Sequence, residues 1–378
     1  MDATCDVLIV GAGIIGLAVG ERLVSSGFKR VWILEKEPMP ATGSTGRSAG
    51  GIRQQFEDPH KVRAAHVGFS VYDTFQDRYG VDPEFKKHGY LILRSTEEGA
   101  MALKAGVERQ QALGLPTELL TPEGVKARIP ALNTHDLTAG SFNATDGYLD
   151  PHALVKGFQA AFKREGGGLF CGEAAQSLVM ERGRVIGVLT SKRTIHAGAV
   201  VIAPGPHAEL LLAPVGVHLP LRTCRRQIFV TGSIQGVAPE WPLILDVDAP
   251  FYFRPEGPGV IMSFAEMDEI PPPREGNDIP QNRKSLPLLA EKASHRCPIL
   301  ENAEIVNSWA GLRTLTPDER PILGPVNTLD QLCIAVGFSG HGITLAPFAA
   351  EFLLGELTGK PLGPDLRNPF LSYRFQRP

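Results

Sequence analysis

Three glycines near the start of the chain have the spacing of a phosphate-binding turn. They lie in the segment GAGIIG at residues 11–16, between a short apolar run at residues 6–10 and a helical stretch at 17–26. In such a turn Gly11 makes the tight bend, Gly13 lets the backbone approach a pyrophosphate, and Gly16 lets the helix pack closely. The N–H groups and the positive dipole end at the helix start then favour the binding of an anion.

An acidic residue completes this pattern. Glu35 ends the next apolar run, at residues 31–34, which predicts a second strand parallel to the first. A carboxylate in this place accepts hydrogen bonds from the hydroxyls of a ribose. The unit is therefore expected to hold the ADP part of a dinucleotide, which NAD and FAD share.

Two later glycine-rich segments favour FAD. Residues 43–51, GSTGRSAGG, are mostly small or hydroxyl-bearing, and their backbone can lie against a flat ring system. Residues 337–342, GFSGHG, precede a helical stretch, so they offer N–H groups and a positive dipole end. A reduced, anionic flavin requires such an environment at N1 and the C2 carbonyl. Each segment alone is also typical of an ordinary glycine-rich loop.

The remaining pattern predicts an α/β (or α+β) protein with a Rossmann-like FAD-binding domain and an interleaved antiparallel-sheet substrate domain. Helices are expected at residues 60–80, 151–165 and 344–357, strands at 90–93, 177–180, 185–190, 199–203 and 332–336, further strands within 216–305, and a polar loop at 271–282. The FAD-binding domain is expected to comprise residues 1–80, 150–215 and 305–378, and the substrate domain residues 81–149 and 216–304.

The composition limits the classes of function. The chain has 378 residues, 43% of them hydrophobic, which is enough for two domains. Its 38 basic and 41 acidic residues give a net charge of -3, which argues against a nucleic-acid partner. No apolar run has the length of a signal sequence or a membrane span, and the five cysteines lack metal-binding spacings. We therefore expect a cytoplasmic protein with no bound metal and no membrane span.

Seven segments spread over the chain resemble one family of flavoenzymes. They are GAGIIG at 11–16, STGRSAG at 44–50, GIRQQF at 51–56, ATDGYLDP at 144–151, VVIAPG at 200–205, WAGLRTLTPD at 309–318 and GFSGHGITLAP at 337–347. Together they resemble the D-amino-acid oxidase superfamily, in the branch that contains glycine oxidase, sarcosine oxidase, D-arginine dehydrogenase and the β subunit of dye-linked L-proline dehydrogenase. The resemblance implies bound FAD and hydride transfer from a carbon bearing a neutral amine to flavin N5. The resulting imine is hydrolysed by water.

The resemblance also assigns residues to the substrate. Arg313 matches the carboxylate-binding arginine of glycine oxidase and D-arginine dehydrogenase, and Arg53 matches one that sarcosine oxidase uses for the same purpose. The planar fork of an arginine fixes the orientation of a carboxylate as well as its charge. Tyr252 matches a pocket tyrosine, and Arg225 an arginine that reaches the pocket in D-arginine dehydrogenase. Without the resemblance, the sequence favours an ion pair of Arg313 with Asp318 or Glu319 over a role in binding, and Tyr252 is equally interpretable as a core aromatic.

The cofactor site is expected to include residues from all the glycine-rich segments. They are Gly11, Gly13, Ile14, Ile15, Gly16, Glu35, Lys36, Ser44, Thr45, Arg47, Ser48, Gly50, Gly51, Gly205, Gly311, Gly340, His341, Gly342, Ile343 and Thr344. Gly311 stands where sarcosine oxidase has the cysteine that bonds its flavin, so FAD is expected to be noncovalent. Ile261 stands where that enzyme has its oxygen-activating lysine, so the electron acceptor stays open among oxygen, a quinone and a partner subunit.

These observations predict an FAD-dependent dehydrogenase or oxidase of a small amino acid, either a D-amino acid or an N-alkyl glycine. One alternative is the catalytic β subunit of a larger complex that oxidises L-proline or another imino acid, which the segments GIRQQF and GFSGHG favour. Another is a flavin-binding assembly factor without catalysis. Gly51 and Phe56 differ from the pocket histidine and lid tyrosine of D-arginine dehydrogenase, which weakens arginine as the substrate.

Overall fold

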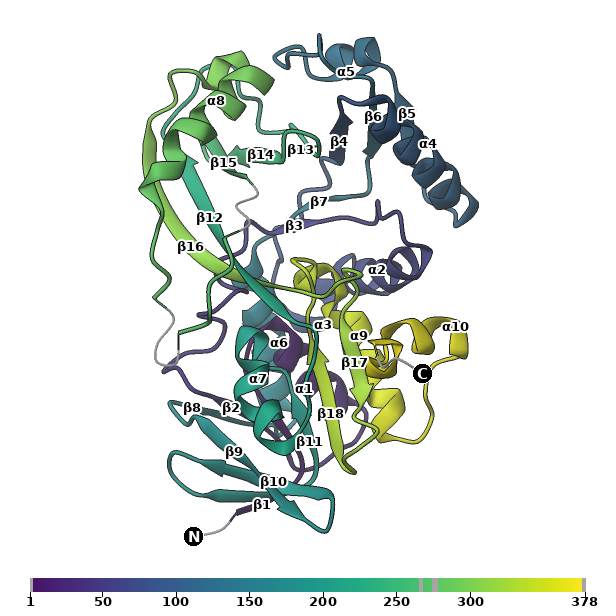
Figure 1. Ribbon diagram of the computed structural model, residues 1–378, viewed down its shortest axis with the longest axis vertical. Coiled ribbons are helices and arrows are strands. Elements are labelled where there is room, and N and C mark those ends of the chain that lie inside the picture. The colour runs from purple at the N-terminus through teal and green to yellow at the C-terminus, as the bar shows by residue number, and fades with distance from the viewer. Residues whose placement is uncertain (1–2, 265–267, 274–277, 376–378) are drawn as a thin grey trace.

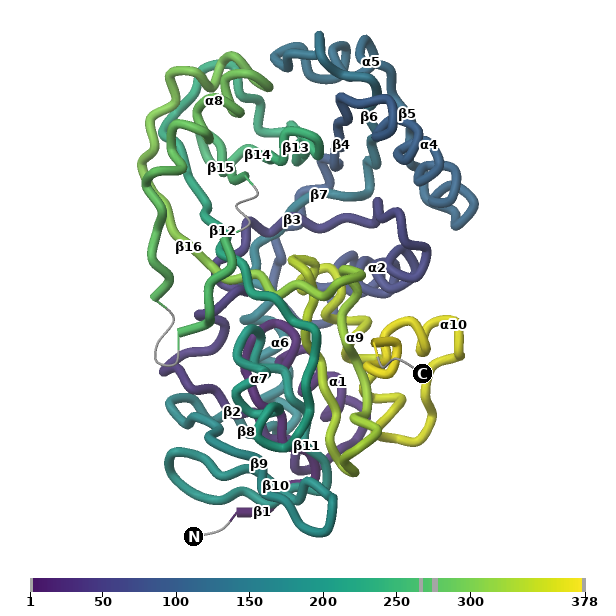
Figure 2. The backbone as a smooth tube through the Cα atoms, in the orientation of Figure 1, coloured from purple at the N-terminus to yellow at the C-terminus, as the bar shows by residue number. Residues whose placement is uncertain are grey.

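The computed structural model describes residues 3–264, 268–273 and 278–375, which form two parts built around two large sheets (Figure 1). The chain passes from the lower part to the upper part and back twice, and both termini lie in the lower part (Figure 2). This path confirms the expected mixed α/β fold.

The lower sheet is parallel at its centre. Its order is β17 (Ile322–Pro325), β18 (Leu332–Val336), β11 (Thr194–Ile202), β1 (Ala3–Val10), β2 (Val31–Glu35) and β8 (Gly168–Cys171), with β10 (Arg184–Thr190) beside β11 and β9 (Ala175–Glu181) beside β10. The strands β18, β11, β1, β2 and β8 run parallel. The apolar runs of β1 and β2 predict this for those two strands, as in a sheet covered on both faces, whereas β8 was not predicted.

Helices cover both faces of this sheet. Val7 and Ile9 of β1 face a core shared with α1 (Ile14–Ser25), α2 (Pro59–Tyr72), α3 (Phe75–Tyr79), α6 (Pro151–Arg164) and α9 (Gly342–Leu357). Leu8 and Val10 point the other way, towards β10 and the short helix α7 (Ala208–Leu212). The short helix α10 (Pro364–Arg367) contacts α2. Because the parallel strands end at the same edge of the sheet, the turn at residues 11–16, which follows β1, lies beside Glu35, which ends β2.

The upper sheet is almost wholly antiparallel. Its order is β16 (Ile305–Leu315), β12 (Arg222–Thr231), β15 (Gly259–Phe264), β14 (Phe251–Glu256), β13 (Leu243–Asp246), β4 (Tyr90–Arg94), β6 (Ala139–Asn143) and β5 (Glu118–Leu120). Only the pair β13 and β4 is parallel among these described strands. One face packs against α5 (Pro122–Arg128) and α8 (Leu286–Arg296) in a core that contains Phe253 and Leu289. A two-stranded ribbon, β3 (Gly51–Ile52) with β7 (Gly147–Tyr148), lies below this sheet, between it and the lower part (Figure 1).

Two of the longer helices were absent from the sequence prediction, as were the short helices α5, α7 and α10. The helix α4 (Glu97–Ala112) lies where the pattern reads as irregular, because few of its residues are buried and its apolar stripe is therefore weak. The helix α8 lies within the segment expected to be rich in strands. The expected helix at 60–80 is divided into α2 and α3 at Asp73 and Thr74. The expected loop at 271–282 has neither helix nor strand where it is described, and residues 274–277 of it lie outside the described part.

The division into two domains with the boundaries given above stays a prediction. It places residues 305–315 in the FAD-binding domain, whereas these residues form β16, which pairs along its length with β12 of the upper sheet. Both strands extend from the upper sheet towards the lower part (Figure 1).

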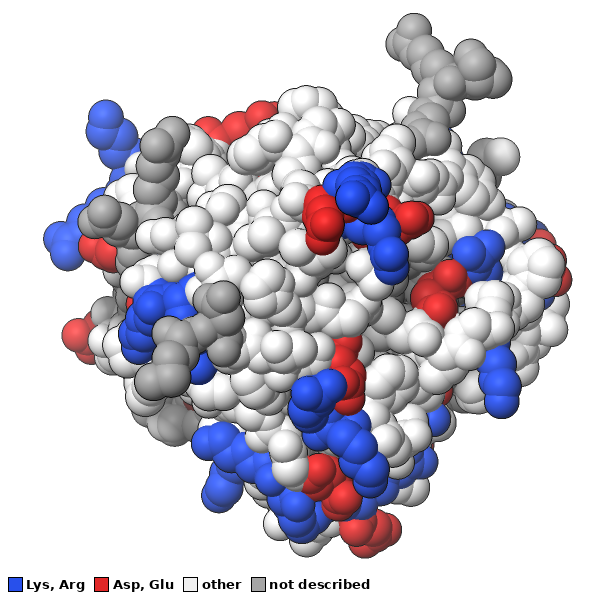
Figure 3. Space-filling model, turned by 90° about the horizontal axis from the view of Figure 1, so that it is seen from below, with Lys and Arg blue, Asp and Glu red and all other residues white. Residues whose placement is uncertain are grey.

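Within the described ranges, no helix combines the length and the hydropathy needed to cross a bilayer, and no group of three or more His, Cys, Asp or Glu side chains is placed to hold a metal ion. On the face in Figure 3, acidic and basic side chains are interspersed around a broad uncharged area. The absence of a nucleic-acid partner and the cytoplasmic location stay predictions.

A buried arginine ties helix α8 to the upper sheet. Arg296 and Asp246 are each 1% exposed, and the Arg296 Nε atom lies 2.7 Å from Asp246 Oδ2. The Arg296 Nη2 atom also lies 2.9 Å from Asp136 Oδ2. The interaction fixes strand β13, which faces the cavity described below.

We predict that Arg296→Met lowers the free energy of unfolding by about 3–5 kcal/mol, because Asp246 becomes a buried carboxylate without its cation. The control is Arg30→Met, which removes an ion pair with Asp6 whose side chains are 58% and 38% exposed. That variant should lose less than about 1 kcal/mol. Equilibrium unfolding in urea measures both, and equal losses would contradict the prediction.

Candidate active site

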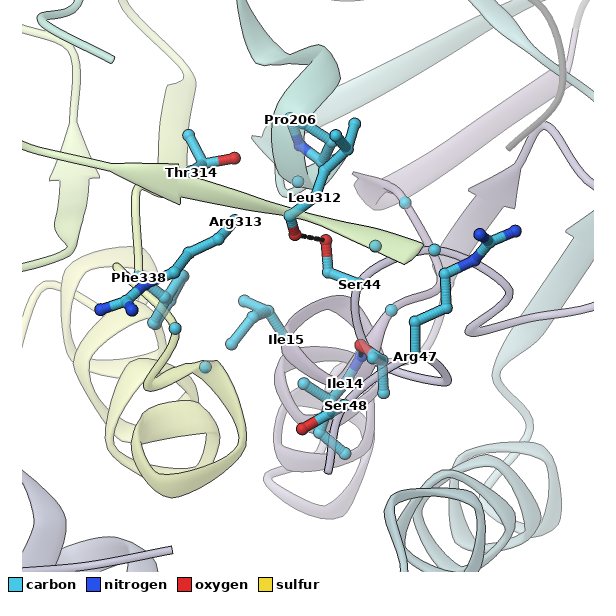
Figure 4. A pocket seen from close by; sticks show the side chains of 18 of the residues that line it. Ile14, Ile15, Ser44, Arg47, Ser48, Pro206, Leu312, Arg313, Thr314 and Phe338 are labelled. Carbon is cyan, nitrogen blue, oxygen red and sulfur yellow. Dashed lines mark hydrogen bonds between the residues drawn. The ribbon is translucent and has the colours of Figure 1, made fainter. Parts of the chain in front are cut away.

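A cavity of about 510 Å³ lies between the two parts of the molecule. It is lined by the turn after β1, the loop at residues 41–51, strands β12, β13, β14 and β16, and the turn before α9. A cavity of this size at the carboxyl ends of parallel strands is typical of a site for a cofactor and a small ligand. Figure 4 shows β16 crossing the site above the start of α1 and beside the start of α9.

Two glycines of the turn, Gly11 and Gly16, lie too close to their neighbours for any side chain. Gly11 has a φ of +104°, and a Cβ atom there would lie 2.4 Å from the carbonyl oxygen of Ala203. A Cβ atom on Gly16 would lie 1.9 Å from the Gly11 oxygen. Gly13 caps α1 without a side-chain hydrogen bond, and the first turn of α1 has no acidic residue. These features fit a pyrophosphate at the helix start.

Glu35 is held at the end of β2 by two backbone groups. Its Oε2 atom accepts a hydrogen bond from the Ala12 N–H at 2.9 Å, and Oε1 accepts one from the Glu37 N–H at 3.0 Å. Burial raises the pKa of this carboxyl group. The hydrogen bonds from Glu37 and Ala12 lower it again in part. The position fits an acceptor for ribose hydroxyls at the adenosine end of the site.

The loop at residues 43–48 is fastened to β16. The Ser44 hydroxyl donates to the Leu312 carbonyl at 2.7 Å (Figure 4), the Arg47 guanidinium donates to the Ala310 carbonyl, and the Trp309 indole donates to the Arg47 carbonyl at 3.1 Å. A Cβ atom on Gly311 would lie 3.1 Å from the Cβ atom of Arg47. The small residues of the loop and of β16 therefore leave a space bounded by backbone, which suits a flat ring system.

Two arginines lie at the other end of the cavity. Arg313 extends from β16 towards the turn before α9 (Figure 4), and its buried Nε atom has no hydrogen-bond partner among the described residues. Gly340 permits this position, because a Cβ atom there would lie 2.6 Å from Arg313 Nε. The Arg53 Nη2 atom lies 3.4 Å from His341 Nε2. Neither guanidinium forms an ion pair within the part of the chain that the structure describes.

The titratable groups around these arginines have shifted pKa values. Burial lowers the pKa of His341 well below its usual value, and the nearby charges of Lys61, Arg53 and Arg313 lower it further. Burial also lowers the pKa of Lys61 to about 8 and that of Arg313 below its usual value. His341 is therefore neutral near pH 7, while the Arg313 guanidinium keeps its charge.

Two tyrosines face the same end of the cavity. Tyr252 on β14 lies opposite Leu245 of β13, and Tyr90 on β4 lies opposite Leu243. Burial raises the pKa of both hydroxyls, that of Tyr90 to about 12. Both hydroxyls therefore stay protonated and can donate hydrogen bonds.

Comparison with known proteins agrees with this architecture. The model of the DAO family, described as FAD dependent oxidoreductase, matches residues 6–356. The chain belongs to the DAO family of FAD-dependent oxidoreductases. It is 29% identical to FAD-dependent oxidoreductase domain-containing protein 1 of Bos taurus, over 98% of this chain and 84% of the relative.

Other relatives are longer or have been solved as structures. The chain is 26% identical to the mitochondrial dimethylglycine dehydrogenase of Homo sapiens and 25% to the mitochondrial pyruvate dehydrogenase phosphatase regulatory subunit of Mus musculus, over 92% and 93% of this chain. It spans only 42% and 41% of those relatives. The crystal structure of L-proline dehydrogenase from P. horikoshii is similar with a TM-score of 0.91 and 29% identity, covering 100% of this chain and 99% of that one.

The structure of this flavoprotein brings most of the predicted site residues to the cavity. Arg53, Arg313 and Tyr252 line it, as do the predicted cofactor residues other than Gly16 and Gly50. Gly16 packs α1 against the turn, as expected. Gly50 has a φ of +75° and lies so close to Leu149 that a Cβ atom would be 2.0 Å from the Leu149 oxygen.

Arg225 is placed differently from the expectation. It is absent from the described lining of the cavity, its Nη2 atom lies 2.5 Å from Asp268 Oδ2, and Nη1 donates to the Pro280 carbonyl. Its neighbour Arg226 lines the cavity instead, because successive residues of a strand point to opposite faces. The sequence contains both arginines side by side, and only the burial of one face of β12 distinguishes them.

Several other cavity residues were not singled out from the sequence. Glu173, Tyr90, His207, Leu243, Leu245 and Ile279 line the cavity. Glu173 faces the adenosine end and is neutralised by Arg193, 3.0 Å away. Glu173 and His207 belong to no recognisable motif, although the position of Tyr90 at the start of a predicted strand is visible in the sequence.

A buried aspartate orients the segment that carries Arg53. Asp146 lies in the turn between β6 and β7, accepts from the Gln54 N–H at 2.8 Å and from Gln55 Nε2 at 3.1 Å, and has no exposed surface. Burial raises its pKa to about 7, against the opposing effect of these hydrogen bonds and of Arg53. The carboxyl group therefore gains a proton in the folded state at a pH where the unfolded chain has lost it.

We predict that Asp146 makes the folded state more stable at low pH than at high pH. Between about pH 4 and pH 7 the folded chain binds the additional proton, so this contribution falls as the pH rises through 7. Urea unfolding of the wild type and of Asp146→Asn at pH 5, 6, 7 and 8 measures it. The difference in free energy of unfolding, wild type minus variant, should decrease with pH, and a difference that rises would contradict the assignment.

We predict that Gly11→Ala reduces flavin binding at least about tenfold, because the added Cβ atom pushes the turn away from β11. The matched control is Gly27→Ala. Gly27 has a φ of +99° but no atom within 4 Å of the added Cβ, so both variants carry about 1–2 kcal/mol of backbone strain and only one is crowded. Titration of the apoproteins with FAD measures the difference, and equal affinities would exclude a role for this close approach.

Proposed function

We propose that this flavoprotein oxidises the C–N bond of a small amino acid, a D-amino acid or an N-alkyl glycine, to an imine that water hydrolyses. Bound FAD supplies the hydride acceptor at N5. The observation that supports the proposal best is the position of Arg313, a partly buried cation in the cavity whose buried Nε atom has no hydrogen-bond partner and which forms no ion pair among the described residues. A buried guanidinium is costly unless it is paired, so a ligand carboxylate is its natural partner.

The arginines bind and orient the substrate in this proposal. Arg313 and Arg53 both present planar forks near the turn before α9, and either can hold a carboxylate through two parallel hydrogen bonds. The hydroxyl of Tyr252 can donate to the same carboxylate. Which arginine makes the bidentate contact stays open, as it does from the sequence.

The charges around the site also favour the reactive form of the amine. Hydride can leave the α carbon only when the nitrogen lone pair is free, so the amine must be neutral. Arg53, Arg313 and Lys61 place positive charge at this end, which lowers the pKa of a bound ammonium group. The helix start at α9, with neutral His341 as its first flanking residue, offers N–H groups to the anionic edge of a reduced flavin.

The electron acceptor is proposed to be a quinone, a dye or a partner subunit in preference to oxygen. Ile261, which stands where sarcosine oxidase has its lysine, is 3% exposed and packs with Ala49 and Ile228. It brings no positive charge that would stabilise superoxide. The flavin is proposed to be noncovalent, because Gly311 has no side chain that could bond it.

Two alternatives have specific support. The similarity to L-proline dehydrogenase over the full length of both chains favours a catalytic subunit that oxidises an imino acid. The similarity to a phosphatase regulatory subunit is compatible with a flavin-binding protein without catalysis. A protein without a substrate has no use for two unpaired arginines in a cavity, so we favour an enzyme.

We predict that Arg313→Ala lowers kcat/KM for the best amino acid on the order of 10²–10³-fold, because the bound carboxylate loses a positively charged hydrogen-bonding partner. For the corresponding amine without a carboxylate, wild type and variant should differ by less than about threefold. Anaerobic bleaching of the flavin measures both rates. Loss of activity on both compounds, or on neither, would contradict carboxylate binding by Arg313.

The same measurement distinguishes the alternatives when it is extended to D- and L-amino acids, sarcosine, glycine and L-proline. Bleaching by proline alone supports the imino-acid dehydrogenase, and a flavin that no compound bleaches supports the non-catalytic protein. Admission of air afterwards tests the acceptor, because slow return of colour with rapid turnover of an artificial dye is expected.

A further inference from the structure

The face of the upper sheet that lines the cavity is charged at one end and mostly apolar at the other. At the β16 and β12 end this face carries Arg313 and Arg226, which line the cavity together with Gly311. At the β14, β13 and β4 end it carries Tyr252, Leu245, Leu243 and Tyr90, here called the apolar wall. Ile244 and Phe253 lie on the other face, in the core with α8. Strand alternation therefore assigns the wall residues to the cavity.

The apolar wall begins beside the carboxylate-binding groups. The Arg53 guanidinium carbon lies 5.6 Å from the centre of the Tyr90 ring. Two residues earlier on the same segment, Gly51 lies against the wall, where a Cβ atom would be 2.6 Å from Leu243 Cδ1 and 3.6 Å from Tyr90 Cε2. A ligand whose carboxylate is held at Arg53 and Arg313 therefore directs the rest of its atoms along this wall.

The charges of the cavity exclude a basic extension of the ligand. Among the described residues that line it, the carboxylates are Glu35 and Glu173, and both belong to the adenosine end. Glu173 is already paired with Arg193. A guanidinium or ammonium group against the apolar wall would have no partner and would face Arg53, so its desolvation would be uncompensated. A second carboxylate there could accept hydrogen bonds from the two tyrosine hydroxyls, but Leu243 and Leu245 would displace the rest of its water without replacing those hydrogen bonds.

We propose that the substrate of this site is an amino acid with an uncharged, apolar side chain or N-substituent, which packs on Tyr90, Leu243, Leu245 and Tyr252. The inference rests on the proposed amino-acid oxidation and names its substrate class. It makes Leu245, a partly buried residue at the centre of the wall, a determinant of specificity.

Binding of carboxylates without an amine tests the inference apart from turnover. Acetate, butyrate, hexanoate, heptanoate, glutarate and 4-guanidinobutyrate are titrated into the FAD-loaded wild type, and the dissociation constants are read from the flavin absorbance. Each added methylene should tighten binding about fourfold, the equivalent of about 0.8 kcal/mol. 4-Guanidinobutyrate should bind at least about 100-fold more weakly than heptanoate, and glutarate at least about 100-fold more weakly than hexanoate.

Two variants of Leu245 sharpen the test. Leu245→Glu should bind 4-guanidinobutyrate at least about tenfold more tightly than Leu245→Gln, which has the same size without the charge. Both should bind hexanoate more weakly than the wild type.

The outcomes separate this inference from the proposed function. Equal or tighter binding of glutarate or 4-guanidinobutyrate by the wild type would overturn the apolar wall as the specificity element, even if amino acids bleach the flavin. Unchanged affinities in both Leu245 variants would overturn it as well. If no carboxylate binds and no amino acid bleaches the flavin, the proposed function itself fails.

Discussion

The site depends on one strand that is bonded to both parts of the molecule. β16 pairs with β12 along its length and so belongs to the upper sheet, yet its residues Ala310 and Leu312 accept hydrogen bonds from the loop that follows the nucleotide-binding unit. The indole of Trp309 returns a bond to that loop. Because these contacts come from backbone carbonyls at fixed spacing, the loop cannot shift along the strand without losing them together. The cavity is the space that this attachment leaves, and Arg313, the next residue but one after Gly311, is carried into it.

The two ends of the cavity are built by different means. The adenosine end is formed by backbone: a glycine turn, a helix start and a glutamate held by two N–H groups. The opposite end is formed by side chains of the upper sheet, with charged residues on β16 and β12 and the apolar wall on β14, β13 and β4. Backbone geometry suits a cofactor whose phosphates and ribose never change, whereas side chains on a sheet can differ from one family member to another without disturbing the fold.

Uncompensated charge is concentrated where the ligand is expected. Arg53 and Arg313 lie near His341, and burial keeps that imidazole neutral so that it adds no further charge. Elsewhere in the molecule buried cations are paired, as Arg296 is with Asp246 and Asp136. The contrast between a paired arginine in the core and unpaired ones in the cavity is a physical distinction between a structural role and a binding role.

The sequence by itself determined the local features whose geometry leaves few choices. The turn at residues 11–16, the strand ending at Glu35 and the helices α6 and α9 were predicted because glycine spacing, caps and apolar periodicity act within a few residues. The tertiary structure alone decided which of Arg225 and Arg226 faces the cavity, because both occupy one strand and only the packing of its two faces distinguishes them. It alone revealed α4, whose exposed surface hides its periodicity, and the apolar wall, in which Tyr90 of β4 lies beside Leu243 and Tyr252 from two strands much later in the chain. Such sites are set by strand pairing over long sequence separations, which no local pattern records.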